Sequence, residues 1–241
     1  MSSGFFYWNG LEFDISNPNV YPPKPASLLL AECAVKIVKS GDRVLDVCTG
    51  CGIVAVAIAK FVPKAVVFAS DINYEAIISA HQNAERNGVK IATVLTDLYD
   101  SFLNNKLDVI TAHPPAVPCP PHKNWRTTLG MSIAINGGSD GLALVSRSIM
   151  EATTCLNKNG KLLLVLPHWC NFKKAYNLLR KNYSSISEIV RQKVEFFPAT
   201  EFKPEKSVIN YAYELAKKGV IEIEFKNNVP YSVVSVVQAI K

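Results

Sequence analysis

The sequence predicts an α/β fold, in which helices cover both faces of a doubly wound, mostly parallel sheet of seven strands. From residue 41 onward, short apolar runs alternate with longer helical patterns, as βαβ units require. One such run, 43–47, continues through Gly50 and Gly52 into a helix of small residues, and the next run ends close to Asp71. A glycine-rich turn between strand and helix, followed by an acid one strand later, is typical of Rossmann-like sheets that bind nucleotides at their carboxyl edge.

The first forty residues are expected to cover this sheet. Residues 5–15 are predicted to form a β-hairpin, because an Asn-Gly pair lies between two apolar runs and favours a tight turn. A proline-broken segment, 17–25, then leads into an amphipathic helix over 26–38. We therefore expect a hairpin-and-helix cover over 1–40 and a ligand-binding catalytic unit over 41–241.

Within the larger unit, strand and helix patterns alternate, and the last strands are expected to pair antiparallel. The expected strands are 43–47, 65–70, 91–95, 107–112, 161–166, 186–196, 220–226 and 231–238. The expected helices are 52–60, 74–87, 140–156, 171–182 and 209–217. The helix over 140–156 is well marked, since Ser139 and Asp140 are good N-caps and an apolar stripe follows. The stripe consists of Leu142, Val145, Ile149 and Ala152.

Composition limits the classes of function. With 241 residues, of which 49% are apolar and 19% charged, the chain is long enough for one globular domain with an ample core. It has no apolar run as long as a membrane span, and its start lacks the basic flank of a secretory signal. We therefore expect a cytoplasmic protein without a membrane partner. The net charge of +6 is spread along the chain, which argues against a nucleic-acid partner.

The six cysteines are scattered among the expected helices and strands, as is usual for reduced thiols in a cytosol. Cys48 and Cys51 form a Cys-x-x-Cys pair within the glycine turn. A zinc site needs two further ligands at close spacing, and the sequence offers none nearby. We therefore expect no metal, and we interpret the pair as small residues that fill the turn.

The glycine turn admits two classes of nucleotide ligand. Residues 50–55 satisfy the loose Gly-x-Gly-x-x-Ala pattern of dinucleotide-binding dehydrogenases, and Asp71 lies where an acid accepts hydrogen bonds from a ribose. A dehydrogenase has no use for a buried acid such as Asp46 beside its pyrophosphate, because the carboxylate repels the phosphates at low dielectric. Asp46 therefore favours a cationic ligand, S-adenosylmethionine (SAM), and an NAD-dependent dehydrogenase remains the weakest alternative.

Further motifs accompany this turn in a fixed order. They are Asp46-x-x-Thr-Gly-x-Gly, Ser-Asp71-Ile-Asn, Thr96-Asp97-Leu, His113-Pro-Pro-Ala, Asn136-Gly-Gly-Ser-Asp-Gly and Asn159-Gly-Lys-Leu-Leu-Leu, preceded by Asn19-Val-Tyr-Pro-Pro. Over roughly residues 19–170, this order resembles the HemK/PrmC-type class I SAM-dependent methyltransferases, which methylate the side-chain amide nitrogen of glutamine in release factors. Bacterial members carry a helical domain before the glycine turn. Only about forty residues precede the turn here, so we expect that domain to be missing.

The resemblance implies how SAM is held. Asp46 would hold its amino-acid end, directly or through water, Asp71 would accept hydrogen bonds from the ribose, and Asp97 would contact the adenine amine. Neighbouring motif positions complete the implied cofactor-binding set, which is Asp46, Cys48, Thr49, Gly50, Gly52, Asp71, Ile72, Asp97 and Leu98.

The acceptor motif departs from the family. Its members have Asn-Pro-Pro-Tyr, whereas this chain has His113, Pro114, Pro115 and Ala116. Histidine lacks the paired donor and acceptor of asparagine, and alanine offers no aromatic face. We therefore expect methyl transfer to a nitrogen or oxygen of a small molecule. Two alternatives use the same cofactor: a HemK-like protein amide N-methyltransferase, and a cyclase that consumes SAM and releases methylthioadenosine.

Catalysis is expected to rest on His113, Pro114 and Pro115. Each proline fixes φ, and the residue before a proline is held extended, so the carbonyl groups point rigidly at the acceptor. A pKa near neutrality would let His113 take a proton from an amine or hydroxyl. Alternatively, His113 only bonds a neighbour at the end of the strand. Tyr21 and Trp125 are expected to cap the substrate.

Overall fold

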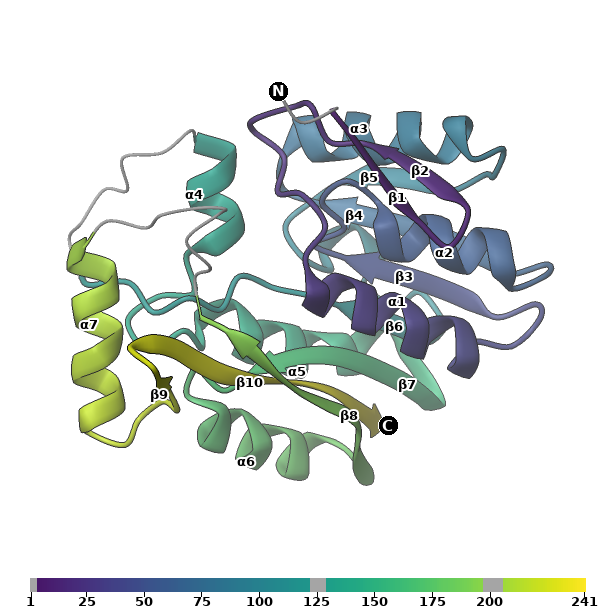
Figure 1. Ribbon diagram of the computed structural model, residues 1–241. Helices are drawn as coiled ribbons and strands as arrows, with labels where there is room; N and C mark the ends of the chain where they lie inside the picture. Colours follow the sequence, from purple (N-terminus) through teal and green to yellow (C-terminus); the bar gives the residue numbers. More distant parts are fainter. Residues whose placement is uncertain (1–3, 122–128, 197–205) are drawn as a thin grey trace.

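A central sheet runs through the computed structural model, which describes residues 4–121, 129–196 and 206–241 (Figure 1). Its strands are β3 (Arg43–Val47), β4 (Val66–Asp71), β5 (Ala92–Leu95), β6 (Leu107–Ala112), β7 (Leu156–Pro167), β8 (Ser185–Glu195), β9 (Glu224–Lys226) and β10 (Val229–Ile240). They follow the order β5-β4-β3-β6-β7-β10-β8, and the short β9 pairs with β10 beside this path. The first five are parallel, and β10 runs antiparallel to both of its long neighbours. The predicted mostly parallel, doubly wound sheet is confirmed, and the short β9 makes it eight strands where seven were predicted.

Helices cover both faces of this sheet. They are α1 (Pro25–Ile37), α2 (Ile53–Phe61), α3 (Tyr74–Arg86), α4 (Leu129–Ile135), α5 (Ala143–Cys155), α6 (Phe172–Asn182) and α7 (Lys206–Lys217), with a short 3-10 turn at Asp100–Phe102. One apolar cluster joins α1, α2 and α3 to one face, and a second joins α5 and α6 to the other. Strand β3 shows why: Val44 belongs to the first cluster, while Leu45 and Val47 belong to the second. Alternating side chains thus bury both faces, as parallel sheets require.

Helix α5 differs from the sequence prediction in where it begins. Helix α5 begins at Ala143 rather than at residue 140, and its N-cap is Leu142. Gly141 has φ +73°, a left-handed conformation that interrupts a helix, and a Cβ there would lie 2.4 Å from the carbonyl oxygen of Ala116. Asp140 instead accepts hydrogen bonds from the backbone N–H of Leu142 and from the side chain of Asn171. The apolar stripe predicted for this helix is buried as expected.

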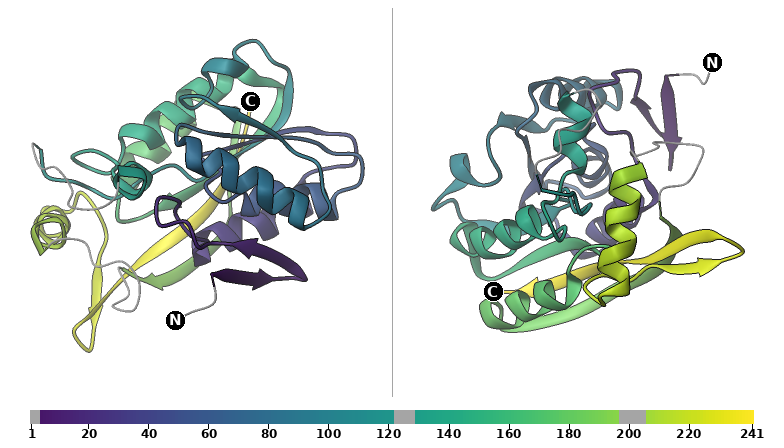
Figure 2. Two further views of the ribbon diagram at one scale, coloured as in Figure 1. Left: turned by 90° about the horizontal axis from the view of Figure 1, so that it is seen from above. Right: turned by 90° about the vertical axis from the view of Figure 1, so that its left-hand side faces the viewer.

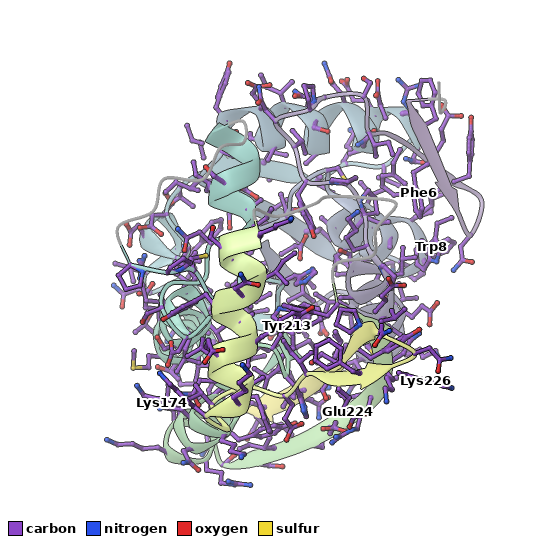
Figure 3. The ribbon with its side chains drawn as sticks, turned by 60° about the vertical axis from the view of Figure 1, so that its left-hand side comes forward. Phe6, Trp8, Lys174, Tyr213, Glu224 and Lys226 are labelled. Atoms are coloured by element: carbon purple, nitrogen blue, oxygen red, sulfur yellow. The ribbon has the colours of Figure 1, made fainter. Side chains whose placement is uncertain are left out.

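Helix α4 was not predicted, because its seven residues are too few to display a helical period. It lies on the same side of the molecule as α7 (Figures 1 and 2), and the two meet where Val117, Ile135 and Val208 form a small buried cluster. Helix α7 begins at Lys206, three residues before the predicted start, and carries Tyr213 (Figure 3). The Tyr213 ring contacts Phe225 of β9 edge-on, with ring centroids 5.1 Å apart. Both helices therefore border the carboxyl edge of the parallel strands.

The N-terminal hairpin consists of β1 (Phe5–Trp8) and β2 (Leu11–Asp14) and packs on α3 (Figure 1). Asn83 on α3 is fully buried and links two segments of the chain. Its Oδ1 accepts the backbone N–H of Asp14 at 2.8 Å, and its Nδ2 donates to the carbonyl oxygen of Cys51 at 2.9 Å. One amide therefore connects the hairpin to the glycine turn.

We expect Asn83→Ala to lower the free energy of unfolding by about 1–3 kcal/mol, because the backbone groups of Asp14 and Cys51 lose their buried partner. Chemical denaturation monitored by circular dichroism measures the change. Gln82→Ala is the matched control, since Gln82 is exposed on the same helix. Equal stability of the two variants would contradict the linking role of Asn83.

Candidate active site

One cavity lies where β3, β4 and β6 end, covered by residues 21–27 and bordered by the last residues of α4. Most of the residues singled out in the sequence line it: Tyr21, Cys48, Thr49, Gly50, Asp71, Ile72, Asp97, Leu98, His113, Pro114 and Pro115. Asp46 and Gly52 lie behind this lining, and Trp125 lies outside the described residues. Strands that are distant in sequence end side by side here, because parallel strands bring their carboxyl ends to one edge.

The backbone of the glycine turn forms part of the cavity wall. Cys48, Gly50 and Gly52 all have positive φ, at +58°, +54° and +86°. At Gly52 a Cβ would lie 2.9 Å from both the Cα and the Cβ of Ala80 on α3, so only glycine fits. The turn thus packs closely against α3 on one side and leaves the Gly50 backbone in the cavity wall on the other.

Asp71 closes the opposite wall at the end of β4. Its Oδ2 accepts the backbone N–H of Gly50, and its Oδ1 accepts the backbone N–H of Asn73, both at 3.0 Å. Desolvation raises the pKa of this carboxyl, and the two N–H groups oppose that rise. Each carboxylate oxygen retains a lone pair, so Asp71 still accepts hydrogen bonds from a ligand.

Asp46 is buried beneath the turn, with 2% of its surface exposed. The hydroxyl groups of Thr49 and Thr111 each donate to one of its oxygens at 2.7 Å. Burial nevertheless raises its pKa to about 6. A carboxylate in such a place is stabilised by a positive charge nearby, and the described residues place no cationic side chain in contact with it.

Asp97 has a partner that the sequence did not reveal. Nη1 of Arg147 on α5 donates to both of its oxygens at 3.0 Å, while Nε of the same guanidinium donates to Glu151 at 2.7 Å. These bonds raise the pKa of Arg147, first through Glu151 and then through Asp97. The four-residue spacing of Arg147 and Glu151 signals a helical ion pair, but nothing in the sequence places this pair beside Asp97.

His113 contacts Ser27 on α1, with 3.3 Å between its Nδ1 and the serine Oγ. The structure does not give His113 the near-neutral pKa that the sequence analysis assumed. Desolvation in the cavity wall lowers the pKa to about 4, so the imidazole is neutral at physiological pH. Ser27 was not predicted as a site residue, because no local pattern connects it to a residue 86 positions later.

Aromatic side chains border the acceptor end of the cavity. Tyr21 lines it, and the ammonium of Lys24 lies 5.6 Å from the centre of the Tyr21 ring. Trp169, which follows β7, also lines it and was not predicted. The buried Ala116 also lines the cavity, and Gly137 packs closely against its backbone. The aromatic face that Ala116 does not supply is therefore present elsewhere in the wall.

The cavity suits a nucleotide-like ligand that carries a positive charge. The apolar side chains of Ile72 and Leu98 line it near Asp97, and the carboxylate of Asp71 lies at its wall. Behind the turn, Asp46 is a buried acid that lacks a positive neighbour. Among the described residues no cluster of three or more His, Cys, Asp or Glu side chains is placed to hold a metal. In the same residues, no helix is long and apolar enough to cross a membrane.

Comparison with known proteins agrees with this geometry. Residues 16–123 match the methyltransferase small domain family. The chain is 32% identical over 171 residues to the release factor glutamine methyltransferase of Gloeobacter violaceus, covering 67% of this chain and 58% of that protein. It is 32% identical over 180 residues to the putative protein N5-glutamine methyltransferase of Methanocaldococcus jannaschii, covering 75% of this chain and 88% of that protein. The chain thus spans little more than half the length of the first relative and most of the second.

Two further matches are to methyltransferases named for other kinds of substrate, an amino acid and an RNA. The chain is 30% identical over 172 residues to the 4-amino-L-phenylalanine/4-methylamino-L-phenylalanine methyltransferase of Streptomyces pristinaespiralis, covering 67% of this chain and 58% of that protein. The T. thermophilus 16S rRNA N2 methyltransferase RsmC, solved with AdoMet and guanosine, superimposes with a TM-score of 0.57 at 16% identity, over 98% of this chain and 49% of that chain. This last likeness concerns the fold alone. Together, the cavity and the matches show that the chain belongs to the HemK/PrmC-type family of class I SAM-dependent methyltransferases.

Proposed function

We propose that this chain methylates the side-chain amide nitrogen of a glutamine in a protein. The observation that carries the proposal is the position of His113, Pro114 and Pro115, which line the same cavity as the glycine turn and Asp71. The release factor and N5-glutamine relatives are named for a glutamine acceptor of this kind. The small-molecule acceptor expected from the sequence becomes the second candidate.

The cavity wall favours positioning over proton removal. His113 has a pKa of about 4 and cannot hold a proton at neutral pH, and burial raises the pKa of the Cys48 thiol well above its usual value. The acceptor therefore has to be a group that can be methylated without a strong base. What it needs from the protein is alignment with the methyl group and removal of its water. A neutral amide meets this requirement, because its N–H becomes strongly acidic once the nitrogen carries the methyl group, and the proton passes to water without a strong base. Alignment with desolvation supplies about 7–11 kcal/mol in favourable cases.

In this proposal, one set of residues binds the cofactor and another aligns the acceptor, at two ends of the cavity. SAM brings an activated methyl group, so the protein needs no metal for the transfer. Asp71 and the backbone of Gly50 hold the cofactor end, and Asp46 supplies negative charge behind it. At the acceptor end, Pro114 aims its carbonyl oxygen rigidly, where it accepts a hydrogen bond from the substrate N–H and orients the nitrogen lone pair.

A small-molecule amine is the second candidate, and Ala116 favours it. The wall carries only a methyl group at this position, where the family has tyrosine, so its shape differs from that of the glutamine enzymes. One relative of comparable identity is named for a small aromatic amino acid with an amine acceptor. An acceptor of that kind would lie between Tyr21 and Trp169, which both line the cavity.

Methyl transfer from radiolabelled SAM separates the candidates. Release factor, a glutamine peptide and 4-amino-L-phenylalanine are offered in parallel, with Asp71→Ala as the negative control. We expect label in the protein and the peptide, with S-adenosylhomocysteine as the by-product. Label in the free amine alone would replace the first candidate by the second, and methylthioadenosine without labelled product would indicate cyclisation.

The low pKa of His113 predicts how the rate depends on pH. Because His113 is already neutral above pH 5, its ionisation should produce no limb between pH 6.5 and 8.5 at saturating SAM. Single-turnover rates of the wild type and His113→Asn should therefore give curves of the same shape. A limb near pH 6.5 that disappears in His113→Asn would show instead that the histidine accepts a proton.

A further inference from the structure

The side chain of Ser27 meets His113 with a defined set of donors and acceptors. Ser27 lies in the first turn of α1 with 8% of its surface exposed. Its Oγ accepts the backbone N–H of Lys24 at 3.4 Å and lies 3.3 Å from Nδ1 of His113. A hydroxyl has one hydrogen to donate, and a neutral imidazole has one N–H and one bare nitrogen.

One assignment of hydrogens leaves fewer groups unpaired than the other. If Nδ1 carried the hydrogen, Ser27 Oγ would accept two hydrogen bonds, and its own hydrogen would be left without an acceptor among the described residues. Buried polar groups rarely remain unpaired. If the hydroxyl donates to Nδ1, the serine hydroxyl and Nδ1 are both paired. The hydrogen of the neutral imidazole then lies on Nε2, and only that N–H is left for a ligand.

The second nitrogen of His113 is open to the cavity. Nε2 has no hydrogen-bond partner among the described residues. The side-chain atoms that are both buried and unpartnered in this part of the chain are Ser148 Oγ and Trp169 Nε1, so Nε2 is not sealed in the interior. Since His113 lines the cavity, its free edge faces the space that the acceptor occupies.

We propose that Ser27 is a positioning residue that holds His113 in the Nε2–H tautomer, so that His113 donates a hydrogen bond to a substrate oxygen next to the methyl-accepting nitrogen. This inference rests on the proposed function for the identity of that nitrogen. A donor at His113 and an acceptor at the Pro114 carbonyl match the two halves of an amide group. The histidine thus replaces the family's asparagine as a group that recognises the substrate and does not remove a proton.

The tautomer is measured without any substrate. Long-range ¹H–¹⁵N correlation spectra of the ¹⁵N-histidine-labelled protein distinguish protonated from bare ring nitrogens, and His113→Gln identifies the signal among the four histidines. We expect a protonated Nε2 and a bare Nδ1 in the wild type and in Ser27→Thr, and a mixture of tautomers in Ser27→Ala. A protonated Nδ1 in the wild type, or an unchanged spectrum in Ser27→Ala, would overturn the proposal.

Kinetics with a glutamine peptide test the substrate oxygen. We expect Ser27→Ala to raise KM for the glutamine peptide about fivefold or more at unchanged SAM affinity, with rescue by Ser27→Thr. Ser146→Ala is the control, because its hydroxyl donates within α5. An equal KM for the glutamine peptide in both alanine variants would refute the oxygen contact.

The two proposals fail separately. If no glutamine peptide is methylated but the spectra show the Nε2–H tautomer lost in Ser27→Ala, the proposed amide substrate is wrong and the positioning role of Ser27 stands. If the peptide is methylated and the tautomer does not depend on Ser27, the function stands and the positioning role is wrong.

Discussion

Asp71→Ala is expected to weaken SAM binding by about 5- to 150-fold, corresponding to about 1–3 kcal/mol. The variant removes a carboxylate that is placed to accept hydrogen bonds from a ligand and already holds the Gly50 and Asn73 backbones. Part of the loss therefore comes from the direct contact and part from a less ordered glycine turn. Isothermal titration calorimetry measures the affinity, and the melting temperature without ligand reports the disturbance of the turn.

Asp42→Ala is the matched control for this measurement. It removes the same charge near the start of β3, at the opposite edge of the sheet, where the Asp42 carboxylate accepts the local backbone N–H of Lys39. Both variants change the net charge of the protein equally. A difference between their SAM affinities therefore reports on the binding site and not on the overall electrostatic field. Asp71→Ala binding SAM as tightly as Asp42→Ala would remove Asp71 from the cofactor site.

The raised pKa of Asp46 predicts a second large effect, on stability. Its carboxyl has a pKa of about 6 in the folded chain against an ordinary value of 3.8. The folded state therefore prefers the protonated form, and this contribution to stability is complete below pH 3.8 and lost as the pH rises through 6. By pH 7 the ligand-free protein should have lost about 3 kcal/mol from this group. Denaturant titrations from pH 4 to 7.5 of the wild type and Asp46→Asn measure the difference.

Binding of a cation should reverse that preference. A positive ligand near the buried carboxylate favours its charged form, so SAM affinity should fall by up to about tenfold per pH unit below 6 and level off above it. Calorimetry in buffers of different ionisation enthalpy should detect proton release on binding near pH 5.5. Asp46→Asn should flatten the profile. Equal pH profiles of the two proteins would show that Asp46 does not sense the cofactor.

The sequence predicted the parallel part of the sheet well because each strand there is a short apolar run next to a glycine or an acid. Strand 43–47 agrees with β3 residue for residue, and 107–112 agrees with β6. The C-terminal region was harder. The expected strand at 220–226 is only β9, Glu224–Lys226, because Ile221 is buried beside Phe196 and Ala212 in a local cluster instead of a ladder. A segment that packs by its side chains in this way shows no alternating apolar pattern from which the sequence could predict it.

The residues of the candidate site were also predictable only in part. Motif positions such as Gly50, Asp71 and His113 line one cavity because they follow strands that end at one edge. Ser27 and Arg147 act on those positions from helices elsewhere in the chain, through contacts that depend on how the helices pack. Spacing in the sequence carries no information about such contacts. It also did not reveal that desolvation lowers the pKa of His113, since burial is a property of the folded chain.

The double attachment of Asn83 has a consequence for local fluctuations of the fold. Because one amide on α3 bonds both the Asp14 backbone and the Cys51 carbonyl, loosening of the glycine turn frees the side chain that also holds the hairpin. Ligand that binds the turn therefore also suppresses opening of the hairpin. Hydrogen exchange of the β2 amides, which lie outside the cavity, therefore slows when the cofactor binds. The N-terminal hairpin serves as a remote reporter of cofactor occupancy.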